Sequence, residues 1–358
     1  MPVLTRMLQS PLHVDIRSGS VEGLGALLHE RYISSTGRVL VAVGPSQGEE
    51  IWKRVEPQLP EAEVVRVSEA SLAAAGAVQE ALAGGYGFDA VVAIGGGRTL
   101  DVAKYAATRA GVPLVAVATN LAHDGLCSPV ASLEHAHGKG SYGVAMPLVL
   151  VVDLDYVRSA PPHLVTAGVG DVVSNLCAIA DWTLANRQRG EPLDGLALAF
   201  AQTAAEAVLR RTDSIADDDF LVVLAESLVL SGMAMSVAGT SRPCSGACHE
   251  ILHAIDQLFP GTSNHGELAG LGALFATHLR RDEARLDQMA QCLAHHGLAL
   301  VPSQVGLTDD QFVEAVLAAP GTRPDRYTIL EHLDLSESQV RSELDSFVRR
   351  LQPGPSTA

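Results

Sequence analysis

Short runs of apolar residues alternate with helical segments up to about residue 155. The runs are rich in Val, Leu and Ala, which is typical of buried strands. They span residues 38–43, 63–67, 89–97, 112–119 and 148–157. The segments between them, such as 69–84 and 98–110, show the Ala and Leu spacing of helices. Repeated strand–helix–strand order with uniformly apolar strands predicts a parallel sheet covered by helices on both faces.

The pattern changes at the Ala160-Pro161-Pro162 step. Beyond it, nearly every segment has helical periodicity, with Gly and Pro only at the joints. The segment 336–351 is one amphipathic example, with Ser336 as its expected N-cap. We therefore expect two domains in these 358 residues, an α/β domain over 1–160 and an all-α domain over 161–358.

The charge and cysteine content narrow the range of partners. A formal net charge of −16 disfavours nucleic acid and anionic membranes as partners, because both require a cationic surface. The first residues lack the apolar core of a signal peptide, and apolar runs such as 148–154 are too short to cross a bilayer. Five cysteines without a CxxC pair fit a reducing compartment. We expect a cytoplasmic protein.

A triple glycine stands between an expected strand and an expected helix. Gly95, Gly96 and Gly97 would let the backbone approach a pyrophosphate, while the helix beginning near Arg98 would point its free N–H groups at that anion. Asp101 follows in the first helical turn. The spacing G-G-G-x-x-x-D differs from the Rossmann G-x-G-x-x-G, so it indicates a dinucleotide site of another lineage. A tight turn without a ligand is the alternative.

A polar loop, residues 118–129, follows the next expected strand. The carboxyl ends of parallel strands form the edge where ligands bind. The loop would bring Thr119, His123, Asp124 and Ser128 to that edge. A loop-internal hydrogen bond between His123 and Asp124 remains a structural alternative.

The segment Cys248–His253 contains H-E-x-x-H, the pattern of zinc proteases. His249 and His253 lie on one face of a helix, and His265 begins a further helical segment after a turn. Asp171 has a default interpretation as a helix N-cap, yet its carboxylate would complete a three-ligand zinc set with one open position. Histidines that only stabilise the core are the alternative.

The surrounding sequence disfavours a protease. A metzincin requires Gly at position 256 and His at position 259, where this chain has Asp256 and Phe259. A thermolysin-like enzyme requires a glutamate about twenty residues after the motif, and position 272 is Gly. A protease would also leave the triple glycine without a purpose.

Six segments between about residues 90 and 333 occur in the order of a known family. They are GGGRTLDVAKYAA, HDGLCSPVASL, SAPPHLVTAGVGDVVSNLCAIADW, SRPCSGACHEILHAID, NHGELAGLG and RPDRYTILEHL. Together they make the chain resemble the glycerol-1-phosphate dehydrogenase family, within the superfamily of iron-containing alcohol dehydrogenases, glycerol dehydrogenases and dehydroquinate synthase-like enzymes. The resemblance implies an α/β dinucleotide-binding domain followed by an all-α domain that holds metal and substrate.

The resemblance also implies roles for individual residues. Asp171, His249 and His265 would hold one divalent metal ion, Zn²⁺ or else Ni²⁺ or Fe²⁺. His253 and Asp124 would be the catalytic residues, and together with Asp171 they would contact the substrate. NAD(H) or NADP(H) would be held by Gly95, Gly96, Gly97, Arg98, Thr99, Leu100, Asp101, Thr119, Asn120, Leu121, Ala122 and Ser128. Gly44-Pro45-Ser46 offers no acid for the ribose, so both dinucleotides are expected to serve.

The implied reaction interconverts dihydroxyacetone phosphate and sn-glycerol 1-phosphate, a phosphorylated triose and polyol, in a homo-oligomer. Departures from the family pattern at Asn120, Leu121, Ala247 and Cys248 keep another polyol or phosphorylated ketone as an alternative substrate. A dehydroquinate synthase-like cyclase would need several cations around its substrate, and the matched segments offer few. These are Lys104, Lys139 and Arg242. A non-catalytic binding protein is disfavoured, because every expected metal and cofactor position holds a chemically competent residue.

Overall fold

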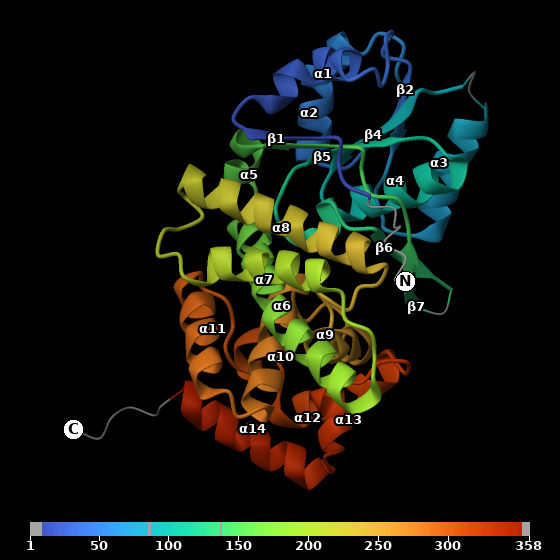
Figure 1. Ribbon diagram of the computed structural model, residues 1–358. Helices are drawn as coiled ribbons and strands as arrows, with labels where there is room; N and C mark the ends of the chain where they lie inside the picture. The colour runs from blue at the N-terminus through green and yellow to red at the C-terminus, as the bar shows by residue number, and fades with distance from the viewer. Residues whose placement is uncertain (1–8, 85–86, 137, 353–358) are drawn as a thin grey trace, which may run out of the picture. The chain divides into compact units, whose positions relative to one another are not determined.

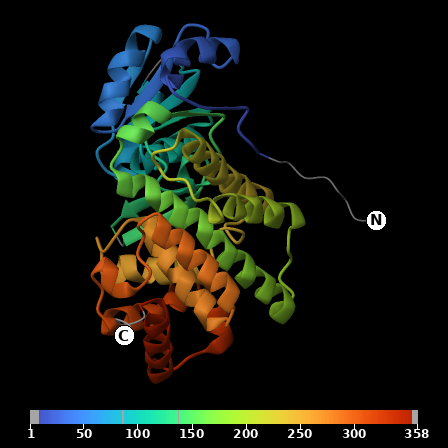
Figure 2. The same cartoon turned by 90° about the vertical axis from the view of Figure 1, so that its left-hand side faces the viewer.

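The structure is a computed structural model that describes residues 9–84, 87–136 and 138–352. The chain divides into two compact units, Met1–Pro162 and His163–Ala358. Figures 1 and 2 show the first unit in blue to green and the second in green to red. A parallel sheet with helices forms the first unit and helices form the second, which confirms the predicted fold class.

A six-stranded sheet forms the centre of the α/β unit. Its strands are β1 (His13–Arg17), β2 (Val39–Val43), β3 (Glu63–Arg66), β4 (Ala90–Gly95), β5 (Leu114–Ala118) and β8 (Val149–Asp153). Their order is β1-β8-β5-β4-β2-β3, and every neighbouring pair is parallel. Five of these strands were predicted. β1 was not, because this edge strand is only partly buried and contains no continuous apolar run.

Both faces of the sheet are covered, as the uniformly apolar strands predict. Val41 of β2 and Val92 of β4 are paired and belong to a buried cluster that includes Leu24 and Trp52. These two side chains come from α1 (Leu24–Glu30) and α2 (Gln47–Val55). The helices α3 (Leu72–Gly84) and α4 (Gly97–Ala110) also contact the sheet and each other (Figure 1). The remaining helical elements of this unit are α5 (Leu154–Ser159) and three short 3-10 turns, Ser20–Gly23, Glu56–Gln58 and Asp124–Leu126.

An antiparallel hairpin, β6 (Val130–His135) and β7 (Gly138–Gly143), follows the polar loop. The sequence pattern did not predict it. The segment GKGSYG has few residues that favour strands, and its pairing with β6 supplies the missing stability. The backbone N–H of Ser132 in β6 donates to Oδ2 of Asp101 in α4 at 3.0 Å, which ties the hairpin to this helix.

Nine helices form the described part of the second unit. They are α6 (Pro162–Arg189), α7 (Gly195–Leu209), α8 (Asp218–Ala238), α9 (Ala247–Leu258), α10 (His265–Leu279), α11 (Glu283–His295), α12 (Asp309–Ala318), α13 (Ile329–Leu333) and α14 (Glu337–Leu351). Short 3-10 turns cover Pro302–Val305 and Ala319–Thr322. Phe275 of α10 meets Phe312 and Phe347 edge-to-face, with ring centroids 5.2 and 5.4 Å apart.

Two helices of this unit, α6 and α8, are long and apolar enough to span a membrane by length and composition alone. The expectation that apolar runs are too short to cross a bilayer overlooked them, because it considered only runs such as 148–154. Their most apolar stretches are 67% and 61% buried within the fold. This burial is typical of core helices.

The neutral side chain of His296 gives the helical unit a pH dependence. Only 8% of His296 is exposed, and its ring stacks on Phe220 with centroids 4.7 Å apart. Burial, assisted by repulsion from His295 and opposed by Asp213, lowers its pKa from 6.5 to about 4. The unfolded chain therefore takes up a proton at a higher pH than the folded chain does. The stability that neutral His296 contributes is present above pH 6.5 and is lost as the pH falls towards 4.

The free energy of unfolding of the wild type falls between pH 7 and pH 4. We expect the fall in the His296→Gln variant to be about 2 kcal/mol smaller. Urea unfolding at each pH measures the difference. His278, whose pKa burial also lowers, is unchanged in the variant and contributes equally to both proteins. Identical pH profiles for the two proteins would show that His296 is not the group that titrates.

Candidate active site

Asp171, His249 and His265 come together inside the helical unit. One ligand atom from each lies within 4.8 Å of the others. Oδ1 of Asp171 is 3.7 Å from Nε2 of His249 and 3.7 Å from Nε2 of His265. Asp171 and His249 are buried, while 32% of the His265 side chain is exposed. One side of the cluster is therefore open within this unit.

The dimensions of this cluster suit a small divalent cation. Ligand atoms bound at about 2.1 Å in tetrahedral geometry lie about 3.4 Å from one another, close to the separations here. Two imidazoles and one carboxylate are the donor types that zinc and related transition metals accept. A buried carboxylate is also stabilised by a bound cation, because the low dielectric strengthens the attraction. The three side chains fit such an ion and leave a coordination position open.

Glycines let the three ligand-bearing helices approach one another closely. A Cβ at Gly170, next to Asp171 in α6, would collide with the backbone oxygen of Gly266 in α10. A Cβ at Gly272 of α10 would lie 2.6 Å from the backbone oxygen of Cys248 in α9. These contacts occur one residue away from Asp171, His265 and His249. Backbone contact between helices therefore fixes the ligand positions.

Asp171 and His265 occupy different places in their helices. Asp171 lies inside α6 and is buried, so its default interpretation as a helix N-cap is wrong. Gly168 and Gly170, which precede it, are also inside this helix. His265 is the first residue of α10, as predicted, because Asn264 caps the helix through a hydrogen bond from the Glu267 backbone N–H at 3.0 Å.

His253 stands beside this cluster and has a partner that sequence reasoning missed. Its ring centroid is 6.2 Å from that of His249 and 6.4 Å from that of His265. Nε2 of His253 accepts a hydrogen bond from Nη2 of Arg323 at 3.0 Å. A guanidinium can only donate, so the neutral ring carries its proton on Nδ1. The segment RPDRYTILEHL contains Arg323, but no spacing rule links it to His253.

The glutamate of the H-E-x-x-H pattern is not available as a base at this cluster. Glu250 is fully buried in α9, and its Oε2 accepts a hydrogen bond from the Thr328 hydroxyl at 2.9 Å. Burial raises its pKa to about 8. Glu250 is therefore part of the buried core of the helical unit, and its position disfavours a protease mechanism that would use it as the base.

Asp181, ten residues after Asp171 in α6, anchors the start of α9. Its Oδ2 accepts the Ala247 backbone N–H at 2.8 Å, and its Oδ1 accepts the Ile329 backbone N–H at 2.8 Å. It also forms a buried ion pair with Arg280. A Cβ on Gly246 would collide with this carboxylate. The helix that carries one ligand thus holds the helix that carries another.

Sequence reasoning did not single out Asp181. Its signal in the sequence is weak, because a lone aspartate in a helix is usually exposed.

The triple glycine of the α/β unit begins α4 one residue earlier than predicted, at Gly97. Cβ atoms on the three glycines would meet three different side chains. A Cβ at Gly95 would lie 2.6 Å from Oγ1 of Thr99, and a Cβ at Gly96 would lie 2.7 Å from Nδ2 of Asn120. The third at Gly97 would strike the ring of His123. The glycines therefore let the loop 119–123 lie against the N-terminus of α4.

The predicted dinucleotide residues fall into two groups. Gly95, Thr99, Leu100, Asp101, Thr119, Leu121 and Ser128 are buried. Gly96, Gly97, Arg98, Asn120 and Ala122 are at least partly accessible. Asp124, the predicted substrate contact, is also partly accessible and begins the 3-10 turn that follows His123. The accessible residues are the ones that a dinucleotide could touch, and the buried ones shape the loop.

Lys104 explains how the loop after Ala122 keeps its shape. Its side chain is fully buried, and Nζ donates to the backbone oxygens of Gly125 at 2.7 Å and of Val130 at 2.5 Å. Nζ also pairs with Oδ1 of Asp101 at 2.8 Å. The predicted cofactor residue Asp101 is thus committed to Lys104 and the hairpin.

We expect Gly97→Ala to weaken NADH binding roughly tenfold, because the added methyl group displaces His123 from the place where a pyrophosphate would meet the helix N-terminus. A fluorescence titration with NADH measures the dissociation constant. Gly76→Ala is the matched control, since a Cβ there meets nothing within 4 Å. Equal affinities for the wild type and Gly97→Ala would contradict the assignment.

Lys104 and Arg242, two of the cationic side chains that a cyclase could use, are bonded to other protein groups. Lys104 is enclosed as described, and Arg242 forms a two-point hydrogen-bonded pair with Glu191 at 2.7 and 2.6 Å. Lys139 lies on the exposed strand β7. These placements disfavour a dehydroquinate synthase-like cyclase.

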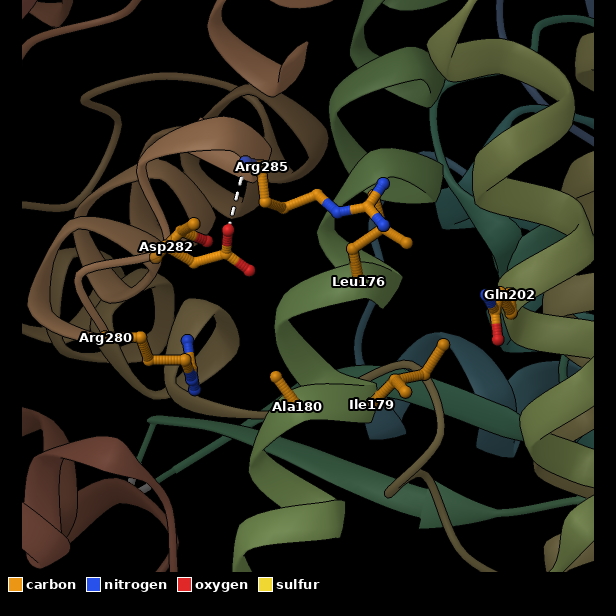
Figure 3. A pocket seen from close by; sticks show the side chains of 8 residues that line it. Leu176, Ile179, Ala180, Gln202, Arg280, Asp282 and Arg285 are labelled. Carbon is orange, nitrogen blue, oxygen red and sulfur yellow. Dashed lines mark hydrogen bonds between the residues drawn. The ribbon is translucent and has the colours of Figure 1, made fainter. Parts of the chain in front are cut away.

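A separate pocket of about 190 Å³ lies within the helical unit (Figure 3). Its labelled residues come from α6, α7, the segment that joins α10 to α11, and the first turn of α11. Arg280 and Arg285 both line it, and both form ion pairs, with Asp181 and Glu206 respectively. None of the proposed metal ligands lines this pocket. It is therefore distinct from the histidine cluster.

The five cysteines are free and buried, as expected for apolar fillers. Burial raises the pKa of the Cys127 and Cys292 thiols to about 12. These thiols are therefore protonated and unreactive at neutral pH.

Comparisons with known proteins agree with this architecture. The model of the iron-containing alcohol dehydrogenase family matches residues 15–161. Glycerol-1-phosphate dehydrogenase [NAD(P)+] of Methanothermobacter thermautotrophicus is 31% identical over 331 residues, which cover 91% of this chain and 93% of that protein. Its counterpart in Hyperthermus butylicus is 33% identical over 329 residues, covering 90% and 93%.

A solved structure gives the same picture of the fold. The probable glycerol dehydrogenase from Sinorhizobium meliloti is 21% identical, with a TM-score of 0.78 over 98% of this chain and all of that one. The identities to these two relatives, over nearly their whole lengths, go beyond the fold. The chain belongs to the glycerol-1-phosphate dehydrogenase family.

Proposed function

We propose that this protein is a metal-dependent, NAD(P)-dependent dehydrogenase that interconverts dihydroxyacetone phosphate and sn-glycerol 1-phosphate. Relatives named glycerol-1-phosphate dehydrogenase [NAD(P)+] support the reaction. The observation that carries the proposal is the cluster of Asp171, His249 and His265, whose ligand atoms lie within 4.8 Å of one another. We assign Zn²⁺ to this cluster because both its donor set and its spacing suit that ion.

A bound divalent ion would polarise the substrate carbonyl and stabilise negative charge on its oxygen, and the reduced nicotinamide would supply the hydride. Asp171 contributes a buried negative charge that favours a cation. His249 and His265 approach it from two other helices, α9 and α10. Close backbone contacts between these helices keep the three ligands together. The helices contribute position, and the ligand atoms contribute charge.

We propose that His253 donates a hydrogen bond to the substrate. The hydrogen bond from Arg323 to Nε2 leaves the proton of the neutral ring on Nδ1, from where it can hydrogen-bond to a substrate oxygen. Its position beside the metal cluster, with a partly exposed side chain, supports this role. We propose that Asp124 contacts the substrate hydroxyl groups, as the family motif HDG implies.

For the dinucleotide, we propose that Gly96 and Gly97 face the pyrophosphate at the N-terminus of α4. Arg98, Asn120 and Ala122 are the accessible candidates for further contacts. Gly44-Pro45-Ser46 follows β2 without an acidic side chain, so no carboxylate there would repel the 2′-phosphate of NADPH. We therefore propose that both NADH and NADPH serve.

We further propose a cytoplasmic homo-oligomer with no nucleic-acid or membrane partner. The net charge of −16 supports the absence of an anionic partner, and burial of the two long apolar helices supports a protein that does not insert into a bilayer. Light scattering of the purified protein measures the assembly size.

The deciding experiment measures NADH and NADPH oxidation by the zinc-loaded protein with a panel of ketones. The panel contains dihydroxyacetone phosphate, unphosphorylated dihydroxyacetone and several sugar phosphates. We expect the highest kcat/KM with dihydroxyacetone phosphate, and a product that chiral analysis identifies as sn-glycerol 1-phosphate. Turnover of another ketone with none of dihydroxyacetone phosphate would overturn the substrate assignment and leave the dehydrogenase class intact.

A further inference from the structure

Arg323 lies one imidazole ring away from the metal cluster. Its Nη2 donates to Nε2 of His253 at 3.0 Å, and the ring of His253 neighbours those of His249 and His265. Arg323 follows the 3-10 turn Ala319–Thr322, which contacts α9, so the fold holds it beside this helix. Both Arg323 and His253 are partly exposed. A ligand that reaches the open side of the cluster could therefore also reach the guanidinium.

Two further arginines concentrate positive charge next to Arg323. Arg326 is half-buried and donates to the backbone oxygen and hydroxyl of Ser245 and to the hydroxyl of Ser241. Burial and the charges of Arg323 and Arg242 lower the pKa of Arg326 to about 10. Arg326 thus lies within interaction range of both Arg323 and Arg242.

The two carboxylates near these arginines, Glu191 and Glu250, already have hydrogen-bond partners. Glu191 is bound at two points by Arg242, and the Glu250 carboxylate accepts from Thr328. The arginine cluster is therefore held by serines, backbone oxygens and one carboxylate, and it repels itself. A doubly charged anion beside Arg323 would relieve this repulsion.

We infer that Arg323 binds the phosphate group of the substrate and makes the enzyme specific for phosphorylated ketones. This inference rests on the proposed function. In dihydroxyacetone phosphate, only one carbon and the ester oxygen separate the carbonyl carbon from phosphorus. A site for the phosphate must therefore lie close to the site for the carbonyl. A guanidinium has five N–H donors in a planar fork, so Arg323 can bond to His253 and to the backbone oxygen of Thr322 and still present N–H groups and its charge to a phosphate.

The same contact gives Arg323 a second effect. Its bond to Nε2 of His253 fixes the orientation of the ring that is proposed to contact the substrate. Phosphate binding and placement of His253 would then depend on one side chain. A purely positioning role predicts equal losses for phosphorylated and unphosphorylated substrates, whereas a phosphate-binding role predicts unequal losses.

The test compares zinc-loaded wild type with Arg323→Ala and Arg323→Lys. We expect Arg323→Ala to lower kcat/KM for dihydroxyacetone phosphate roughly 100-fold more than kcat/KM for dihydroxyacetone. Arg323→Lys keeps the charge but not the fork, so we expect a loss of roughly tenfold. Arg285→Lys, a change at a partly exposed arginine paired with Glu206, is the control. It should leave kcat/KM unchanged for both dihydroxyacetone phosphate and dihydroxyacetone.

Calorimetry with inorganic phosphate supplies a readout that does not depend on turnover. We expect zinc-loaded wild type to bind phosphate and Arg323→Ala to bind it roughly 100-fold more weakly, with unchanged zinc content and circular dichroism. Equal phosphate affinities, or equal losses of kcat/KM for both ketones, would overturn the inference. Failure of the proposed function is a separate result, because the wild type would then not turn over dihydroxyacetone phosphate, whatever its affinity for phosphate.

Discussion

Replacing His265 with alanine is expected to abolish stoichiometric zinc binding and to lower kcat/KM by at least about 10³-fold. His265 supplies one of three ligand atoms that lie within 4.8 Å of one another, and two ligands do not define a catalytic site. Its side chain is also the most exposed of the three, so alanine should remove a ligand with little loss of packing. The fold should therefore survive while the metal is lost.

Elemental analysis after dialysis measures the zinc content, and steady-state assays measure kcat/KM. His295→Ala is the matched control, since this exposed histidine lies at the end of α11 and its Nε2 bonds to the Asp213 backbone oxygen. The control should keep one zinc ion per chain. A His265→Ala protein that retains both zinc and turnover after thorough chelation would disprove the ligand assignment.

Asp181→Asn is expected to destabilise the protein by about 3–5 kcal/mol, because it leaves the buried Arg280 guanidinium without its counter-charge. Only 14% of the Arg280 side chain and none of the Asp181 side chain is exposed. Solvent therefore compensates little for the lost charge. Arg280 also lines the pocket shown in Figure 3.

Urea unfolding measures this loss, and Asp213→Asn is the control. Asp213 pairs with Arg211 at a partly exposed position, where an ion pair contributes less than about 1 kcal/mol. Because Asp181 also receives the Ala247 N–H, we expect the variant to bind zinc more weakly than the wild type through a less firmly held α9. A destabilisation of Asp181→Asn no larger than that of Asp213→Asn would show that the buried pair does not anchor the helices.

The parts of the fold that were predictable carry their signal in short stretches of sequence. The strands β2, β4, β5 and β8 are buried on both faces, so each is a continuous apolar run. The hairpin β6–β7 has no such run, because both strands are partly exposed and β7 contains three glycines. Its stability comes from pairing and from the Asp101–Ser132 bond, which connects residues 31 positions apart.

The candidate site divides in the same way. The spacing of His249 and His253 indicated one helix face, and the order of the family segments indicated which histidine is a ligand. Neither could reveal that Asp171 lies inside a helix or that Glu250 is turned into the core towards Thr328. Those facts depend on the close approach of α6, α9 and α10, where Gly170 meets Gly266 and Gly272 meets Cys248, and such contacts lie beyond the reach of a local sequence pattern.

The sequence by itself determined the two-part architecture, the helix that carries the H-E-x-x-H pattern and the residue types available for a metal and a dinucleotide. It did so because local periodicity and short motifs act over a few residues. Only the tertiary structure decided that Asp171, His249 and His265 meet, that Arg323 bonds to His253, and that Asp181 and Lys104 are structural. Those outcomes follow from packing and burial, which bring together side chains from distant segments and which no local pattern encodes.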